Sequence, residues 1–443
     1  MRTMILMVPL LAGTALAGPD LLCSDITNGQ TYGVFGDYQS YSFGDVTCNV
    51  GDSSFTYVDS TPDHPVFTSS LYRLRDGRFE QIGLGFVGHT FFPLQGNACD
   101  FGCSPGAPGM LGSGCSDTIG AGLAGGQANL GPRIEVDAWS GAFPYPFSTI
   151  NQTGNPVYKR LKARIADLSD TTALYFVERQ YVSNEELPEA RGNNSSYRQV
   201  SFTPATNSPQ VQGNTYGGEP AIFAWRDHGL GADTPDPSVM ISSTNLPADG
   251  IVHIGSRATS LGGGVWRYDY AIQNQNASRG VNALRIPIGF NRSANEPYFH
   301  DIEYIDEVDN QIDGTDWDFS VVSGYAMWEL GADFDQDPLA NAIRWGTTYT
   351  FSFTSNQPPV EKHAEIGVFD DDGSGPVTMS VVAPLAGPCR VDMNADGALN
   401  FFDISTWINA YNSQDLNADF TGDGVFDFFD ASAYLNEFIQ GCM

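Results

Sequence analysis

Residues 347–354 read Thr-Thr-Tyr-Thr-Phe-Ser-Phe-Thr, an alternation of hydroxyl-bearing and large aromatic side chains. Successive side chains of a β-strand point to opposite faces of its sheet, so this period of two predicts a strand with one buried face. Residues 265–272 alternate in the same way. Residues 365–369 and 377–382 flank the acidic, glycine-containing segment 370–375, which predicts a β-hairpin.

The earlier part of the chain has the same character. Aromatic and β-branched residues fill 175–182 and 197–202, which predicts strands. Residues 161–165 fit a strand or a helical stripe, and we favour the strand. The chain is therefore expected to be mainly β, with one or two antiparallel β-sandwich or jelly-roll domains in the regions 18–205 and 206–385.

The amino-terminal residues have the pattern of an export signal. Arg2 precedes the apolar run 4–11, and Ala15-Leu16-Ala17 supplies the small residues that signal peptidase requires. We expect a signal peptide over 1–17, cleaved after Ala17, and a secreted or cell-surface protein. No later segment approaches the roughly 20 apolar residues of a membrane helix, so we expect no membrane insertion.

The charge balance excludes some classes of partner. The chain has 52 acidic residues against 21 Lys and Arg, a formal net charge of −31. Such a surface repels phosphate backbones and attracts cations, so we expect no nucleic-acid partner.

Seven cysteines in an exported chain indicate disulfides. Cys389 and Cys442 bracket the acidic C-terminal segment, and we expect them to form one bridge. The other five cannot all pair with one another, so one of them is free or intermolecular; they are Cys23, Cys48, Cys99, Cys103 and Cys115. An alternative is a metal site formed by Cys99, Cys103, Cys115 and His89, although an oxidising compartment favours disulfides.

The C-terminal segment contains two twelve-residue loops, 392–403 and 419–430, which start 27 residues apart. Calcium takes six to eight oxygen ligands, and a loop with oxygen side chains at positions 1, 3, 5, 9 and 12 can supply them. Position 7 adds a backbone carbonyl, here that of Ala398 or Val425. Gly397 and Gly424 stand at position 6, where the backbone must turn sharply.

Each loop is followed by residues at helical spacing. The expected apolar stripes are Phe401, Ile404, Ile408 and Tyr411 after the first loop, and Phe428, Ala431, Leu435 and Phe438 after the second. The region 386–443 is therefore expected to be a small helical module of two loop–helix units.

This module resembles a dockerin of the planctomycete type, with a cysteine near each end, a terminal Gly-Cys, and Asp403 and Asp430 at position 12 of the loops. The resemblance implies a paired EF-hand-like fold, bound Ca²⁺ and a cohesin-like or cell-surface protein as partner. It implies the ligands Asp392, Asn394, Asp396, Asn400 and Asp403 in the first loop and Asp419, Thr421, Asp423, Asp427 and Asp430 in the second.

Positions 10 and 11 of the loops depart from the dockerins of cellulose-degrading complexes, which often place small hydroxyl residues there. Here they are the pairs Phe401-Phe402 and Phe428-Phe429. These side chains either belong to the core of the module or form an apolar docking face. The body is also similar to exported bacterial proteins that share segments such as 71–83 and 341–346, which implies relatives but no activity.

The body carries no convincing catalytic motif. The segment 102–106 fits Gly-x-Ser-x-Gly, but Pro105 lacks the N–H that an oxyanion hole needs after the serine. Abundant carboxylates leave glycoside hydrolysis open, because that reaction needs two of them. The richest run is Glu303, Asp306, Glu307, Asp309, Asp313, Asp316 and Asp318, near Trp317 and Trp328, and a second group is Asp333, Asp335 and Asp337.

Two functional hypotheses follow. The first is a noncatalytic exported β protein tethered by its calcium module. The second is a polysaccharide-degrading enzyme or a carbohydrate-binding protein, because dockerins commonly deliver such cargo; this rests on family association alone.

Overall fold

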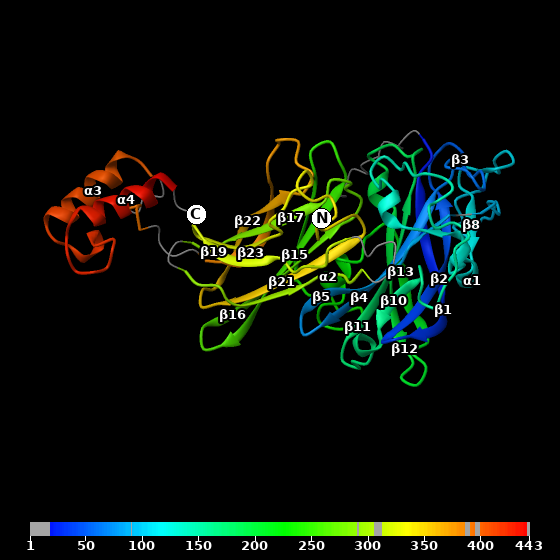
Figure 1. Cartoon of the computed structure of the whole chain (residues 1–443), viewed down its shortest axis with the longest axis horizontal. Coiled ribbons are helices and arrows are strands. Elements are labelled where there is room, and N and C mark those ends of the chain that lie inside the picture. Colours follow the sequence, from blue (N-terminus) through cyan, green and yellow to red (C-terminus); the bar gives the residue numbers. More distant parts are fainter. Residues whose placement is uncertain are drawn as a thin grey trace, which may run out of the picture. The chain divides into compact units, whose positions relative to one another are not determined.

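The computed structural model describes residues 18–89, 91–289, 292–304, 312–385, 390–394 and 399–440 (Figure 1). Strands account for 41% of the chain and helices for 12%, which confirms that the protein is mainly β. All sheets are antiparallel, and the two longest helices lie in the C-terminal module. The expected signal peptide over 1–17 lies outside the described residues.

The chain divides into two compact units. The first comprises the residues up to Arg73, Gln81–Ala224 and Glu303–Asn310, and the second comprises Leu74–Glu80, Trp225–Ile302 and the residues from Gln311 onward. The boundary expected at residue 205 falls in the turn of a hairpin of the first sheet, and the first unit continues to Ala224.

The first unit is built on one large antiparallel sheet with the strand order β1-β2-β10-β5-β4-β11-β12-β13. Its strands are β1 (Leu21–Phe35), β2 (Tyr38–Asn49), β4 (Val66–Arg75), β5 (Arg78–Leu84), β10 (Leu161–Arg164), β11 (Leu174–Val182), β12 (Ser195–Phe202) and β13 (Pro209–Tyr216). Shorter strands extend it or form a small separate ladder: β3 (Phe55–Thr56), β6 (Val87–His89), β7 (Met110–Leu111), β8 (Ser116–Ile119) and β9 (Leu130–Gly131).

Short helices join these strands. They are α1 (Ala121–Ala124), η1 (Gln127–Asn129), η2 (Arg133–Glu135), η3 (Ile165–Leu168) and η4 (Arg191–Asn193). A further helix, α2 (Phe223–Asp227), follows β13 and extends past Ala224, where this stretch of the first unit ends. The segment 161–165, which fitted either a strand or a helix, forms strand β10 and then enters the 3-10 turn η3.

The two end strands of this sheet are held together by side chains. The backbone N–H of Ile26 in β1 donates to the Thr215 hydroxyl in β13 at 2.9 Å. Arg198 of β12 forms an ion pair with Asp25 of β1 at 2.8 Å. The sheet therefore curls around a hydrophobic core, which includes Tyr41 and Val177.

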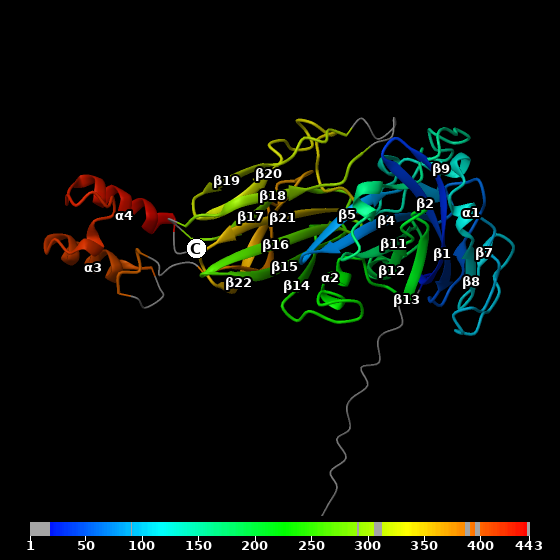
Figure 2. The same cartoon turned by 90° about the horizontal axis from the view of Figure 1, so that it is seen from below.

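The second unit contains two five-stranded antiparallel sheets with the orders β14-β15-β16-β21-β18 and β19-β20-β17-β22-β23 (Figure 2). The first consists of β14 (Met240–Asn245), β15 (Ile251–Gly262), β16 (Val265–Asn274), β18 (Asn295–His300) and β21 (Thr347–Ser355). The second consists of β17 (Val281–Pro287), β19 (Asp318–Val322), β20 (Tyr325–Glu329), β22 (Pro359–Val368) and β23 (Val377–Pro384).

The two sheets of the second unit pack face to face. Trp328 of β20 contacts Phe351 and Phe353 of β21, with ring centroids 5.4 and 6.1 Å apart. Alternate residues of β16 and β21 supply the rest of this layer, as in a β-sandwich. The expected terminal hairpin is confirmed by the pairing of β22 with β23.

Strand β21 differs from the prediction of one buried face, because all nine of its residues are buried. The hydroxyl face is covered by residues 74–80, which belong to the same unit. Thr350 donates to the carbonyl of Phe79 at 2.6 Å, and Arg78 donates to the Ser352 hydroxyl at 3.3 Å. Threonine and serine suit this buried face because the hydroxyls of Thr350 and Ser352 find hydrogen-bond partners there.

Two disulfides, Cys48–Cys99 and Cys103–Cys115, lie in the first unit, and Cys23 is a buried free cysteine. This confirms that the five cysteines of the body do not all pair. The expected Cys389–Cys442 bridge lies outside the described residues.

The C-terminal module contains α3 (Phe401–Asn412), η5 (Leu416–Ala418) and α4 (Phe428–Gln440). Its core is formed by Val391, Trp407, Ala418, Phe420 and Tyr434. The rings of Trp407 and Tyr434 stack with centroids 4.6 Å apart and join the two helices.

The predicted helical stripes are partly wrong. Ile404, Tyr411, Ala431 and Phe438 do pack against the core of the module, but Phe401, Ile408, Phe428 and Leu435 are exposed. Trp407 and Tyr434 take the central positions, because the larger aromatic rings fill the space between the helices.

Candidate calcium site

The second loop, 419–430, is described throughout, and it brings positions 1, 3 and 12 together. The Thr421 hydroxyl lies 3.3 Å from Oδ1 of Asp419 and 3.0 Å from Oδ1 of Asp430. Asp419 and Asp430 are buried. Oxygen atoms from the start and the end of the loop thus meet at the Thr421 hydroxyl.

The backbone of this loop wraps around the Asp419 carboxylate. Its Oδ1 accepts from the N–H of Gly422 at 2.7 Å, and its Oδ2 accepts from the N–H of Gly424 at 2.8 Å. Gly422 and Gly424 have φ angles of +71° and +77°. This is the left-handed region that favours glycine, so the sharp turn predicted at position 6 is present at Gly424.

The other acidic residues of the loop accept backbone hydrogen bonds. Asp423 Oδ1 accepts from the N–H of Val425 at 2.8 Å, and Asp427 Oδ1 accepts from the N–H of Phe429 at 2.8 Å. Asp430 Oδ2 accepts from the N–H of Asp427 at 3.0 Å. Asp427 and Asp430 therefore also fix the first turn of α4.

The described part of the first loop, 392–394 and 399–403, has the same arrangement. Asn400 caps α3 by accepting from the N–H of Phe402 at 2.8 Å. The buried Asp403 accepts from the N–H of Asn400 at 2.9 Å and from the N–H of Asn394 at 3.3 Å. Position 12 is thus tied to position 3 in both loops. Asp396 and Ala398 lie outside the described residues.

Both position-12 carboxyls are held in their ionised form. Hydrogen bonds from the backbone N–H groups of Thr421 and Asp427 lower the pKa of Asp430. Burial raises the pKa of Asp403, but hydrogen bonds from the N–H groups of Asn400 and Asn394 outweigh it and leave the pKa below its ordinary value. Ionised carboxylates are among the oxygen ligands that bind calcium.

These residues fit calcium in donor type and in loop order. Each carboxylate oxygen that accepts one N–H keeps a lone pair for a cation. Among the described residues, however, no group of three or more His, Cys, Asp or Glu side chains stands close enough to hold a metal ion. Completing a calcium site in the second loop therefore requires Asp423 and Asp427 to join Asp419, Thr421 and Asp430.

The four phenylalanines at positions 10 and 11 do not form the core of the module. Phe401, Phe402, Phe428 and Phe429 are 67–77% exposed. Within each pair the rings contact each other edge to face, with centroids 6.4 and 6.2 Å apart. One pair lies at the first turn of α3 and the other at the first turn of α4, so each helix begins with two exposed aromatic side chains.

The alternative metal site in the body is not formed. Cys103 and Cys115 pair with each other, and Cys99 pairs with Cys48. His89 instead lies 4.1 Å from the ring of His64, and its Nε2 is 2.8 Å from the carbonyl of Thr61. The three sulfur atoms are bonded in disulfides, so they cannot act as metal ligands.

Glu303 begins the acidic run, and its partners do not favour a protonated acid. Glu303 is held by the Arg164 guanidinium at 2.6 Å and by the Tyr38 hydroxyl at 2.7 Å. Burial raises the pKa of Glu303, but these partners lower it below its ordinary value. The rings of Trp317 and Trp328 are buried. Asp306, Glu307 and Asp309 lie outside the described residues.

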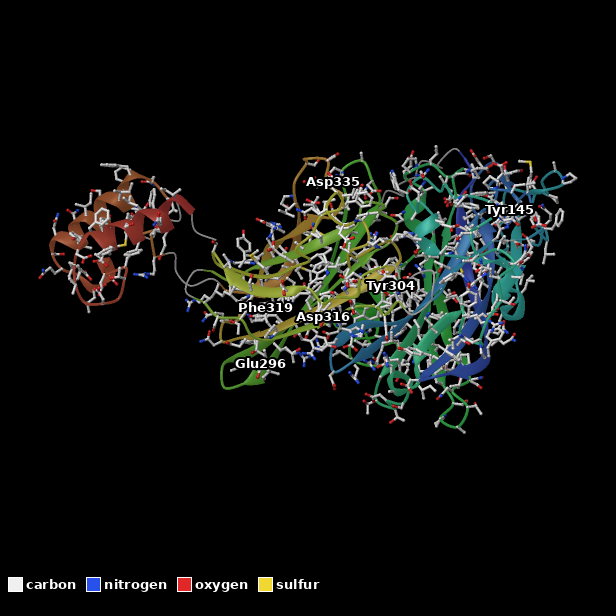
Figure 3. The ribbon with its side chains drawn as sticks, in the orientation of Figure 1. Tyr145, Glu296, Tyr304, Asp316, Phe319 and Asp335 are labelled. Atoms are coloured by element: carbon white, nitrogen blue, oxygen red, sulfur yellow. A yellow bond between two sulfur atoms is a disulfide. The ribbon has the colours of Figure 1, made fainter. Side chains whose placement is uncertain are left out.

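Two further acidic residues that were candidates for a catalytic pair lie apart from each other. Asp316 and Asp335 lie apart on different loops of the second unit (Figure 3). Asp313 accepts from the N–H and the hydroxyl of Thr315, and Asp333 accepts from the N–H of Gln336, so both stabilise their own turns.

One carboxyl that sequence reasoning missed is Asp301, whose pKa is raised by burial despite a hydrogen bond from Asn341. Its sequence context gave no signal, because Asn341 lies 40 residues away.

No protein-family model matches the sequence, and no curated protein is significantly similar to it. No helix among the described residues is long and apolar enough to cross a membrane. Proposals about function therefore depend on the residues of the chain and their geometry.

Proposed function

We propose that the chain is an exported, noncatalytic β protein that is tethered to a partner through a calcium-dependent, dockerin-like C-terminal module. One observation carries this proposal: positions 1, 3 and 12 of the second loop converge around Thr421, and the described part of the first loop ties position 12 to position 3 in the same way. Two equivalent loops, each followed by a helix, support a paired calcium-binding module.

The calcium ligands would come from the chain alone. The first loop would contribute Asp392, Asn394, Asp396, Asn400, Asp403 and the carbonyl of Ala398, and the second would contribute Asp419, Thr421, Asp423, Asp427, Asp430 and the carbonyl of Val425. Calcium would supply the positive charge that offsets the repulsion among these carboxylates. Position 3 is a neutral ligand in both loops, Asn394 in the first and Thr421 in the second.

The exposed phenylalanine pairs support a docking role. Apolar side chains gathered on a small module lose contact with water when a partner covers them, which favours association. The resemblance to dockerins implies a cohesin-like protein as partner, on another chain or at a cell surface. Aromatic side chains are also frequent among the residues that dominate binding energy.

The second candidate function is a polysaccharide-degrading enzyme, a glycoside hydrolase, or a carbohydrate-binding protein. It is supported by the abundance of carboxylates and by the usual cargo of dockerins. The buried rings of Trp317 and Trp328 and the paired state of Glu303 favour the noncatalytic function. Release of reducing sugar from a marine or plant polysaccharide by the purified chain is the result that would replace the first proposal with the second.

Calcium binding is tested by titration calorimetry of the full chain. We expect saturable binding that is lost when Asp392→Ala and Asp419→Ala are combined, with circular dichroism showing loss of helix as chelator does in the unchanged chain. Asp335→Ala is the matched control, because this carboxylate is exposed on a loop of the second unit. If Asp335→Ala lost as much calcium binding as the double variant, the result would indicate diffuse cation binding to an acidic surface instead of two sites.

Docking is tested by capture of exported proteins on the immobilised chain, with and without chelator. We expect one calcium-dependent cohesin-like partner, and we expect Phe401→Ser combined with Phe428→Ser to abolish its capture while calcium binding persists. Leu416→Ser is the control, since Leu416 is equally exposed on the same module but lies outside both loops. Capture that survives the phenylalanine changes contradicts the proposed docking face.

A further inference from the structure

A cavity of about 420 Å³ opens in the first unit, far in sequence from the calcium loops. It lies between the segment 165–175, which runs from η3 into β11, and the segment 199–207, which runs along β12 into the turn before β13. Sites for small molecules usually have volumes of roughly 300–1,000 Å³. The volume is therefore sufficient for a ligand of that class.

The floor of the cavity is apolar. Leu168, Tyr175 and Val200 line it and also belong to the core of the unit, and Phe202 packs against that core. The rings of Tyr175 and Phe202 meet edge to face, with centroids 5.4 Å apart. The cavity thus lies beside the hydrophobic core, and its floor offers an apolar surface to a ligand.

One wall of the cavity is fixed by hydrogen bonds. The Tyr175 hydroxyl donates to the carbonyl of Asp167 at 2.8 Å and to that of Asp170 at 3.1 Å. Asp170 Oδ1 accepts from the N–H and the hydroxyl of Thr172 at 2.8 and 2.7 Å. Asp167 forms an ion pair with Arg73 at 2.9 Å. The segment 165–175 therefore keeps its shape without a ligand.

The opposite wall is fixed in the same way. In the turn between β12 and β13, the hydroxyls of Thr203 and Thr206 lie 2.6 Å apart, and those of Thr206 and Ser208 lie 2.8 Å apart. The N–H of Asn207 donates to the carbonyl of Thr203 at 2.8 Å. Two braced walls mean that binding does not need to order a loop, which favours affinity.

The lining lacks a group that could neutralise an anion. No Lys, Arg or His lines the cavity, and Asp170 is the one charged lining residue. Because Asp170 already accepts two hydrogen bonds from Thr172, it acts chiefly as a part of the wall. Ser169, Thr171 and Asn207 add neutral polar groups. The chain as a whole has a formal charge of −31, which repels anions further.

The geometry points to a binding site for an uncharged small molecule that has an apolar body and a polar, hydrogen-bonding edge. The apolar body contacts Leu168, Val200 and Phe202, and the polar edge faces Ser169, Thr171 and Asn207. This site is independent of the C-terminal module, so it functions whether or not that module binds calcium.

The test uses two fluorescent probes of nearly the same shape, mixed with the full chain. N-phenyl-1-naphthylamine is uncharged, and 1-anilinonaphthalene-8-sulfonate adds an anionic group to the same ring system. We expect saturable fluorescence enhancement with the uncharged probe, affinity at least about tenfold weaker for the anionic probe, and no change on adding chelator. Equal affinity for the two probes overturns the inference of an uncharged ligand.

Variants locate the binding in the cavity. Ala173→Phe and Thr171→Phe each place an additional ring into the lining. We expect each change to lower the affinity of the chain for the uncharged probe about tenfold. Ala205→Phe makes the same change on an exposed residue of the adjacent turn that does not line the cavity, and it should leave binding unchanged. Circular dichroism establishes that each variant is folded.

Two further results contradict the proposal. The first is the absence of any saturable binding of the uncharged probe to the folded chain. The second is an affinity for the uncharged probe that is the same in both lining variants as in Ala205→Phe, because the probe would then occupy another surface. Thr171 is exposed and lies in a loop, so its variant remains informative if Ala173→Phe does not fold.

Discussion

Glu186 is a buried carboxyl in the first unit, 2% exposed. Its Oε1 accepts from the N–H of Leu21 at 2.6 Å, and its Oε2 accepts from the Asn194 amide. Burial raises the pKa of Glu186 to about 8, in spite of these hydrogen bonds. At neutral pH the folded chain therefore keeps a proton that the unfolded chain has lost.

This difference makes stability fall as the pH rises. The unfolded carboxyl titrates near 4.5 and the folded one near 8, so between these values the folded state binds more protons than the unfolded state. We predict that the free energy of unfolding decreases less in Glu186→Gln than in the unchanged chain between pH 5 and pH 8. The two decreases should differ by about a few kcal/mol at most. Urea unfolding at both pH values measures this, and the exposed Glu189→Gln is the control.

His64 produces the opposite dependence. Its ring is buried beside His89, and burial together with that neighbour lowers the pKa of His64 to about 3. The neutral form is favoured in the folded state, so stability is present above about pH 6.5 and is lost as the pH falls toward 3. We predict that His64→Gln shows a weaker loss of stability between pH 7 and pH 4, measured by urea unfolding. The exposed His363→Gln should behave like the unchanged chain.

At the scale of elements, the helices α3 and α4 depend on one aromatic stack. Trp407 lies on Tyr434 at 4.6 Å, whereas its neighbour Ile408 is 45% exposed. We predict that Trp407→Ala destabilises the C-terminal module by about 3–5 kcal/mol, since it removes a buried aromatic side chain, and that Ile408→Ala has little effect. Hydrogen exchange of the amides in α3 and α4 separates the two outcomes. Similar protection in both variants would show that the stack is not the main support.

These elements show what their own sequence could and could not predict. The alternation of 347–354 predicted strand β21, because a period of two is a local property. Its second buried face could not be predicted, since Thr350 is covered by Phe79, 271 residues away. In α3 the apolar residues Ile404, Trp407 and Ile408 fit two overlapping faces, and only the position of α4 determines which one is buried.

At the scale of the whole molecule, the candidate sites also differ in whether their residues are neighbours in the sequence. All proposed ligands of each candidate calcium loop lie within twelve consecutive residues, so their spacing could be recognised directly. The cavity of the first unit combines residues 165–175 with 199–207. No motif marks such a combination, because the sheet brings the segments together. The same holds for the curled first sheet, in which Asp25 meets Arg198.

The separate cores predict how the whole chain responds to calcium. The C-terminal module has its own core around Trp407, and the first unit has its own around Tyr41. A ligand stabilises only the cooperative unit that binds it, by about 2.7 kcal/mol at a concentration of 100 times Kd for one site. We predict that calorimetric unfolding shows one transition that calcium raises and another that calcium leaves unchanged. A single transition that moves as a whole would mean that the module and the body unfold together, and it would require the calcium loops to stabilise the entire chain.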